Sequence, residues 1–142
     1  MIVLANDGIS QVGVEKLENN GFKVITTNVA QDQIIDYINK NSITCLLVRS
    51  ATKVRKDIID SCESLKLIGR GGVGMDNIDV EYAKSKGICV INTPGASSLS
   101  VAELVFAHIM TCSRFLHDSN RNMPLEGLSL IHISEPTRHH VI

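Results

Sequence analysis

Short apolar runs rich in β-branched residues alternate with helix-like segments along most of this sequence. The runs occupy residues 2–5, 23–27, 45–48, 65–68 and 88–91, and most of them are apolar at successive positions. Continuous apolar strands are typical of parallel sheets that are covered on both faces. Strands and helices that alternate at this spacing predict βαβ units, so we expect an α/β fold with a doubly wound, five-stranded parallel sheet.

The charge balance and the cysteines limit the partners and the compartment. The 142 residues carry a formal net charge of −1 with 20% charged side chains, which gives no basis for a nucleic-acid or membrane partner. The first residues lack a basic segment followed by a long apolar run, so we expect no signal peptide. The cysteines form no CxxC pair; they are Cys45, Cys62, Cys89 and Cys112. We expect buried free thiols in a cytoplasmic protein, without a disulfide or a metal site.

A different pattern follows the fifth run. Residues 100–116 are apolar almost all the way round a helix, and Ser100 and Glu103 have the spacing of a capping box that would start it. A membrane span is the alternative interpretation, but Glu103, His108 and Arg114 interrupt the apolar run. We expect this helix to pack against a domain or subunit that the chain does not contain.

The end of the sequence departs from the βα pattern. The segment LSLIHISEPTR, residues 128–138, resembles the conceptual translation of a transposase-based sequencing adapter. We therefore expect residues 128–142 to be a non-native tail. The histidines of this tail, His132, His139 and His140, receive no metal or catalytic role for the same reason.

The stretch LKLIGRGGVGMDNID contains Gly69, Gly71 and Gly74 at the spacing of a dinucleotide-binding fingerprint, directly after an apolar run. That fingerprint also requires a helix that opens at the glycines and an acidic residue about 20 positions further on, at the end of the next strand. Here Asp79 is the predicted N-cap of the next helix, and the next predicted strand is followed by Asn92 rather than an acid. We therefore disfavour a dinucleotide site at these glycines.

Two arginines suggest another use for the glycines. Arg49 follows one predicted strand and Arg70 follows the next, and ligands of open α/β sheets bind outside the carboxyl ends of the strands. Two guanidinium groups, together with free backbone amides of residues 71–74, would form a concave site for a carboxylate or a phosphate. The alternative is that both arginines are solvated surface residues beside a plain turn.

Three stretches of the sequence resemble a known family. IVLANDGIS, LLVRSATKV and IGRGGVGMDNIDVEYAKSKGICVINTPGASSLSVAEL are similar to the D-isomer-specific 2-hydroxyacid dehydrogenases, and among these to the phosphoglycerate dehydrogenases. The resemblance covers residues 1 to about 127. It implies that residues 1–95 form a substrate-binding domain with a flavodoxin-like sheet. Residues 96–127 would then form an interdomain helix that leads to an NAD-binding domain outside this chain.

The resemblance also implies a set of site residues. The substrate-binding residues would be Arg49, Ser50, Arg70, Gly71, Gly72, Val73 and Gly74, with Val73 also on the nicotinamide side of the cofactor. The family's catalytic Arg, Glu and His lie in the second domain, so the resemblance implies no catalytic residue here. The implied ligands are a small anionic 2-hydroxy acid and NAD, and the full-length protein is expected to be a homo-oligomer.

The function that the resemblance implies is oxidation of D-3-phosphoglycerate at C2 by hydride transfer to NAD, a reaction of serine biosynthesis. This chain alone is expected to be inactive. One alternative is another dehydrogenase of the family, of the glyoxylate/hydroxypyruvate or erythronate-phosphate type. A second alternative is a free-standing anion-binding module. Such a module would need a polar outer face on its last helix, and VAELVFAHIM lacks one.

Overall fold

The computed structural model of this protein describes the backbone of residues 1–126 and the side chains of residues 1–122. Residues Met1–Ala96 form one compact unit, and a second unit begins at Ser97. The assignment of the first part to substrate binding and of the second to an interdomain connection stays a prediction. The predicted tail, residues 128–142, lies outside the described residues.

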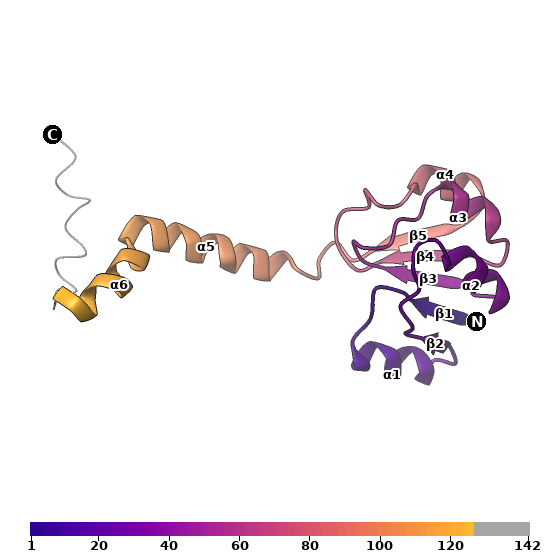
Figure 1. Ribbon diagram of the computed structural model, residues 1–142, viewed down its shortest axis with the longest axis horizontal. Helices are drawn as coiled ribbons and strands as arrows, with labels where there is room; N and C mark the ends of the chain where they lie inside the picture. The colour runs from indigo at the N-terminus through magenta and orange to yellow at the C-terminus, as the bar shows by residue number, and fades with distance from the viewer. Residues whose placement is uncertain (127–142) are drawn as a thin grey trace. The chain divides into compact units, whose positions relative to one another are not determined.

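The first unit is built on a five-stranded parallel sheet (Figure 1). The strands are β1 (Ile2–Ala5), β2 (Lys23–Ile25), β3 (Cys45–Val48), β4 (Leu67–Arg70) and β5 (Cys89–Asn92). Their order across the sheet is β2-β1-β3-β4-β5, and each neighbouring pair is parallel. The predicted α/β fold with a five-stranded parallel sheet is confirmed.

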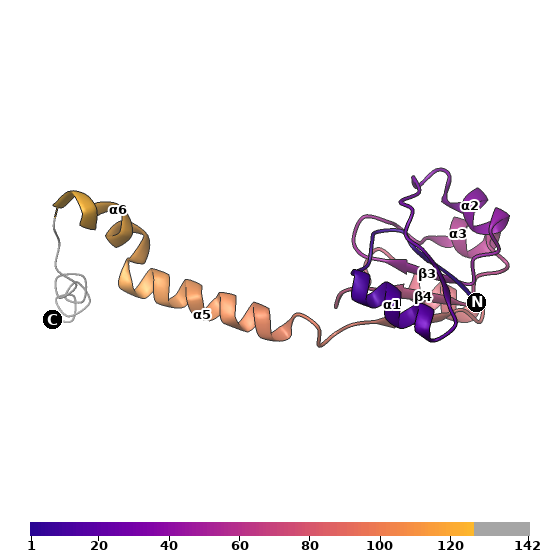
Figure 2. The ribbon, with the colours of Figure 1, turned by 90° about the horizontal axis from the view of Figure 1, so that it is seen from below.

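Four helices connect the strands of this sheet. They are α1 (Gln11–Asn19), α2 (Ile34–Lys40), α3 (Lys56–Ser61) and α4 (Val80–Ser85). Helix α1 lies on one side of the sheet and α3 and α4 lie on the other (Figure 1). In the view from below, α1 lies in front of the strands (Figure 2). This arrangement matches parallel strands joined by right-handed helical crossovers.

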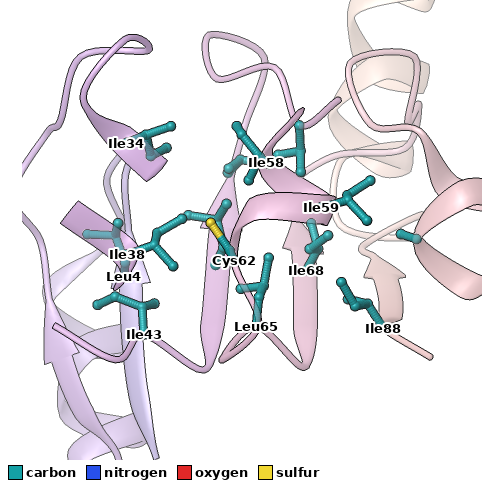
Figure 3. Packing of buried hydrophobic residues seen from close by; sticks show 14 of the residues in the cluster. Leu4, Ile34, Ile38, Ile43, Ile58, Ile59, Cys62, Leu65, Ile68 and Ile88 are labelled. Carbon is teal, nitrogen blue, oxygen red and sulfur yellow. The ribbon is translucent and has the colours of Figure 1, made fainter. Parts of the chain in front are cut away.

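The core lies between the sheet and helices α2, α3 and α4. Leu4, Leu46 and Ile68 are neighbours in register on three adjacent strands, and each is fully buried. They pack against apolar side chains of the helices and of the turns that lead into the strands (Figure 3): Ile34, Ile38, Ile43, Ile58, Ile59, Cys62, Leu65 and Ile88. Burial of one such side chain stabilises the fold by about 1.5–3 kcal/mol, so this layer contributes much of the stability of the first unit.

Two strands begin later than the apolar runs predicted. β4 begins at Leu67 rather than residue 65, and β5 begins at Cys89 rather than residue 88. Leu65 and Ile88 are buried, but their amides donate to Cys62 and Ala83 of the preceding helical segments. The apolar runs therefore include the turn residues that close the core, which a strand pattern alone does not distinguish.

The prediction of four buried cysteines is wrong for two of them. All four thiols are free, but only Cys45 and Cys62 are buried, whereas Cys89 and Cys112 are exposed. Cys89 lies on the edge strand β5, and Cys112 lies on a helix that has no buried residue. Burial raises the pKa of the Cys45 thiol to about 11, which makes this thiol a poor nucleophile.

The second unit contains two helices, α5 (Ser98–Arg114) and α6 (Leu116–Glu126). The predicted start at Ser100 is wrong, because the turn before α5 continues directly into the helix and Ser97 is the N-cap, without a side-chain cap bond. Phe115 adopts a left-handed conformation that ends α5; α6 was not predicted. Large apolar side chains of α5 are exposed, among them Leu99 and Phe106.

Within residues 1–126 no single helix is long and apolar enough to span a membrane. Only the pair formed by α5 and residues 116–122 of α6 meets this requirement, by length and composition, and the pair is bent by 61°.

Candidate functional site

A pocket of about 280 Å³ lies at the carboxyl ends of β3, β4 and β5, beside the segment that follows β1. It is lined by Gly8, Ile9, Leu47, Val48, Arg49, Gly69, Arg70, Gly71, Ile91, Asn92 and Thr93. This edge of an open parallel sheet is where ligands of such folds bind. The volume suits a small molecule rather than a large cofactor.

The floor of the pocket is apolar and depends on one glycine. Leu47, Gly69 and Ile91 are register neighbours on β3, β4 and β5. A Cβ atom on Gly69 would stand 2.7 Å from Cδ2 of Leu47, which is too close for two carbon atoms. The absence of a side chain at Gly69 therefore leaves the space that the end of the Leu47 side chain occupies.

Arg49 supplies a cation to this pocket. Its side chain is exposed and contributes to the pocket lining. The salt bridges found among the described residues join Arg55 to Asp79, Lys84 to Glu81 and Lys86 to Asp60; Arg49 has none within this part of the chain. An unpaired guanidinium at the rim of an apolar pocket is suited to bind a carboxylate or a phosphate.

Arg70 has a different environment from Arg49. Its Nη1 atom donates to the carbonyl oxygen of Gly74, and its Nε donates to the carbonyl oxygen of Arg49 at 3.3 Å. The Arg70 side chain thus spans the loop that follows β4. Arg70 therefore holds the loop by hydrogen bonds that Arg49 does not make, and the binding of an anion by both guanidinium groups stays a prediction.

The amides of the glycine loop are only partly available. The Gly71 amide donates to Val48 O at 2.9 Å, and the Gly72 amide donates to Arg70 O at 3.0 Å and to Thr93 Oγ1 at 2.9 Å. Residues 73 and 74 have no backbone amide partner among the described residues. Of the amides expected to be free over residues 71–74, only those of Val73 and Gly74 have no partner in the described part of the chain.

The glycines do not open a helix. The first helix after β4 is α4, which begins only at Val80, and residues 71–79 between them form an irregular loop in which Ile78 pairs with Val54 in an isolated bridge. A dinucleotide pyrophosphate requires a helix N-terminus directly at the glycines. This stretch does not fit the pyrophosphate of a nicotinamide dinucleotide, in agreement with the interpretation of the sequence.

Asp7 and its partners organise the loop that carries Arg49. Asp7 Oδ2 accepts hydrogen bonds from the amides of Arg49 at 2.6 Å and Thr52 at 3.1 Å, and Oδ1 accepts one from the Thr52 hydroxyl at 2.5 Å. Partial burial by itself would raise the pKa of Asp7, but the hydrogen bonds from Thr52, Arg49 and Ala51 outweigh it and lower that pKa below its usual 3.8. The carboxylate is therefore ionised at neutral pH.

The lowered pKa of Asp7 predicts a pH dependence of stability. The stability that these bonds contribute is fully present above about pH 4, the pKa in the unfolded chain, and is lost as the pH falls through the lower pKa of the folded chain. Asp7→Asn should lower the melting temperature at pH 7 and change it much less at pH 2.5. Thermal unfolding of both proteins across this range measures the difference; an equal difference at both pH values would contradict the assignment.

Asn77 holds the same loop from the other side. It is 6% exposed, and its Nδ2 donates to Arg49 O at 2.8 Å and to Thr52 O at 2.7 Å. These two bonds fix the orientation of the amide, and they leave Oδ1 buried without a hydrogen-bond partner among the described residues. An unsatisfied buried oxygen costs free energy, and the two bonds of Nδ2 offset part of that cost.

The structure divides the predicted site residues into two groups. Arg49, Arg70 and Gly71 line the pocket. The others, Ser50, Gly72, Val73 and Gly74, do not, and Val73 is 54% exposed. Sequence reasoning missed Asp7, Asn77 and the pocket residues of the other strands. The available signal was the polar tripeptide NDG directly after the first run, since polar residues at a strand's carboxyl end often belong to a site.

Comparison with known proteins identifies the family and agrees with the fold. A sequence model of the catalytic domain of D-isomer specific 2-hydroxyacid dehydrogenases matches residues 2–125. A D-3-phosphoglycerate dehydrogenase of Methanocaldococcus jannaschii is 42% identical over 112 residues, which cover 79% of this chain and 21% of that relative. A hydroxypyruvate reductase of Thermotoga maritima is 43% identical over 115 residues, 80% of this chain and 37% of the relative.

Solved structures give the same result for the fold. The D-lactate dehydrogenase of Aquifex aeolicus, complexed with NAD and lactic acid, superposes with a TM-score of 0.65 at 26% identity. The match covers 91% of this chain and 39% of that structure. The chain thus spans well under half the length of the relatives it matches.

Proposed function

This chain belongs to the D-isomer specific 2-hydroxyacid dehydrogenase family, and we propose that it forms the substrate-binding part of an enzyme that oxidises D-3-phosphoglycerate at C2. Similarity to the D-3-phosphoglycerate dehydrogenase of M. jannaschii supports this choice of substrate. The corresponding process is serine biosynthesis in the cytoplasm, and the complete protein is proposed to be a homo-oligomer.

The observation that carries the proposal is the Arg49 guanidinium, which lines the small pocket and has no ion-pair partner in the part of the chain that the structure describes. D-3-phosphoglycerate bears a carboxylate and a phosphate, and either group can accept two parallel hydrogen bonds from a guanidinium. Arg70 holds the loop beside Arg49 and adds a second positive charge at the same rim. Together these side chains would bind and orient the anion while the apolar floor excludes water from the carbon chain.

The cofactor is proposed to be NAD, held mainly by residues outside this chain. The glycine stretch does not fit the dinucleotide pyrophosphate, so no chemical step is assigned to it. Val73, which is exposed in the loop between β4 and α4, stays a candidate contact for the nicotinamide side. Because no catalytic residue of the family is assigned to this chain, we propose that it does not oxidise the substrate by itself.

Two arginine substitutions test the proposal in this chain. Arg49→Ala removes an unpaired cation, so it should weaken binding of 3-phosphoglycerate by roughly 10- to 150-fold, the value of a hydrogen bond to a charged group, and leave the melting temperature unchanged. Arg70→Ala removes the bonds to Gly74 and Arg49 and should lower both affinity and melting temperature. Isothermal titration and thermal unfolding measure the two quantities separately. In the complete enzyme, both changes should mainly raise KM.

The matched control is Arg55→Ala. Arg55 is an arginine of the same loop region, but its guanidinium pairs with Asp79 at 2.8 Å and it does not line the pocket. Its removal should leave the affinity for 3-phosphoglycerate unchanged. If Arg49→Ala also left that affinity unchanged, the pocket would not be the anion site and the proposed role of this chain would fail.

Hydroxypyruvate is the second candidate substrate, because the hydroxypyruvate reductase of T. maritima is as similar to this chain as the phosphoglycerate relative is. Hydroxypyruvate has a carboxylate but no phosphate, so it can occupy only one anionic position. Titration of both acids into the same protein separates the two. Tighter binding of 3-phosphoglycerate supports the first candidate, and equal or tighter binding of hydroxypyruvate supports the second.

A further inference from the structure

We propose that Asp7 is a positioning residue for Arg49: it fixes the Arg49 backbone while leaving the guanidinium unpaired for the anionic ligand. This inference rests on the proposed function, since it names a second residue on which the same anion site depends. Asp7 lies in the segment between β1 and α1, and it does not itself line the pocket.

The peptide groups of Arg49 are held from both sides. The Arg49 amide donates to Asp7 Oδ2 at 2.6 Å. The Arg49 carbonyl oxygen accepts from Asn77 Nδ2 at 2.8 Å and from Arg70 Nε at 3.3 Å. Asp7, Asn77 and Arg70 belong to segments far from Arg49 in the sequence, so three parts of the chain fix one residue at the carboxyl end of β3.

The hydrogen bonds of Asp7 explain why it does not neutralise Arg49. A carboxylate close to an arginine normally forms an ion pair with it, which would compete with an anionic ligand. Here Oδ2 accepts from the amides of Arg49 and Thr52, and Oδ1 accepts from the Thr52 hydroxyl. The negative charge is thus bound by backbone dipoles and a hydroxyl, and the Arg49 guanidinium stays available.

Thr52, the other partner of Asp7, is itself fixed. It is 4% exposed, its hydroxyl oxygen accepts from Asn6 Nδ2 at 2.9 Å, and its carbonyl oxygen accepts from Asn77 Nδ2 at 2.7 Å. Asn6 is also buried and bonds to both the amide and the carbonyl of Val29. Thr52 is therefore held in place by residues other than Asp7. This gives the Arg49 backbone a rigid support of the kind that precise ligand binding requires.

A double-mutant cycle tests this inference. Titration of 3-phosphoglycerate would compare the unchanged chain, Asp7→Asn, Arg49→Ala and the double variant, well below every melting temperature. Asp7→Asn is expected to weaken binding by about threefold to tenfold, the value of one ordinary hydrogen bond. In the Arg49→Ala background the same change should have no further effect, because Asp7 acts through Arg49. A general structural role would weaken binding in both backgrounds.

Asp60→Asn is the matched control. Asp60 also has a pKa lowered by hydrogen bonds, from Lys86 and Tyr82, but it lies away from the pocket residues. Its substitution should leave binding unchanged. Equal losses from Asp7→Asn with and without Arg49, or no loss at all, would overturn the positioning role while the anion site stands. If Arg49→Ala itself has no effect, the proposed function fails first, so the two failures are distinguishable.

Discussion

Asn77→Asp is expected to destabilise this chain by roughly 3–5 kcal/mol at pH 7, the cost of leaving a buried charge without a partner. The new side chain has nearly the same shape, so no cavity forms. The change replaces the Nδ2 group, which donates to Arg49 O and Thr52 O at 2.8 and 2.7 Å, with an oxygen that repels both carbonyls. Proteins of this size are stable by only about 5–15 kcal/mol, so a large fraction of the stability is lost.

The pH dependence of this loss identifies its cause. Burial and the two carbonyl oxygens would raise the pKa of the new carboxyl in the folded chain above the value of about 3.9 in the unfolded chain. The deficit should therefore be smallest below pH 4, where the protonated acid can still donate to one carbonyl, and should grow as the pH rises through the higher pKa. Denaturant unfolding at pH 4 and pH 7 measures it.

The exposed Asn28 supplies the matched control. Its Nδ2 donates to a single carbonyl, that of Asn6, at 2.9 Å. Asn28→Asp makes the same chemical change in contact with water, and it should lower stability by less than about 1.5 kcal/mol with little pH dependence. If Asn77→Asp behaved in the same way as Asn28→Asp, Asn77 would not hold the loop as the contacts indicate.

The sheet could be predicted from the sequence because strand identity depends on local pattern. Runs such as residues 2–5 and 45–48 are apolar and β-branched over their whole length, and they coincide with β1 and β3. The predicted starts of two strands and of one helix were wrong, because an apolar or capping pattern there does not mark the start of the element. Leu65 and Ile88 are apolar because they close the core from a turn, and Ser100 matched a capping box inside a helix that had already begun.

The site could be predicted only in part for a different physical reason. The position of Arg49 and Arg70 at the carboxyl edge follows from the parallel direction of the strands, which the βα pattern predicts. The sequence does not predict that Arg70 bonds to the loop whereas Arg49 does not. That difference depends on whether the side chain lies close to a backbone carbonyl in the folded loop. Asp7 and Asn77 were missed since their partners lie 42 and 28 residues away in the sequence, and these contacts exist only after β1, β3 and β4 pair.

Gly71→Asp is expected to reduce the affinity for 3-phosphoglycerate by more than the roughly 10- to 150-fold expected for Arg49→Ala, and by more than Arg70→Ala does. A Cβ atom at Gly71 would lie 3.6 Å from Cγ and 4.0 Å from Nε of Arg49, which are ordinary contacts, so the aspartate fits. Its carboxylate would then stand beside the Arg49 guanidinium, neutralise it and repel the incoming anion. Like charges placed together at a binding site cost several kcal/mol.

Gly71→Asn separates charge from shape in this experiment. Asparagine has nearly the same volume as aspartate and keeps the Gly71 amide bond to Val48, but it carries no charge, so it should weaken binding far less. Titration at low and high salt adds a second readout, because the repulsion in Gly71→Asp is screened by ions while a steric block is not. Equal losses from both variants would mean that residue 71 only fills space, whereas unchanged binding in Gly71→Asp would exclude this loop from the anion site.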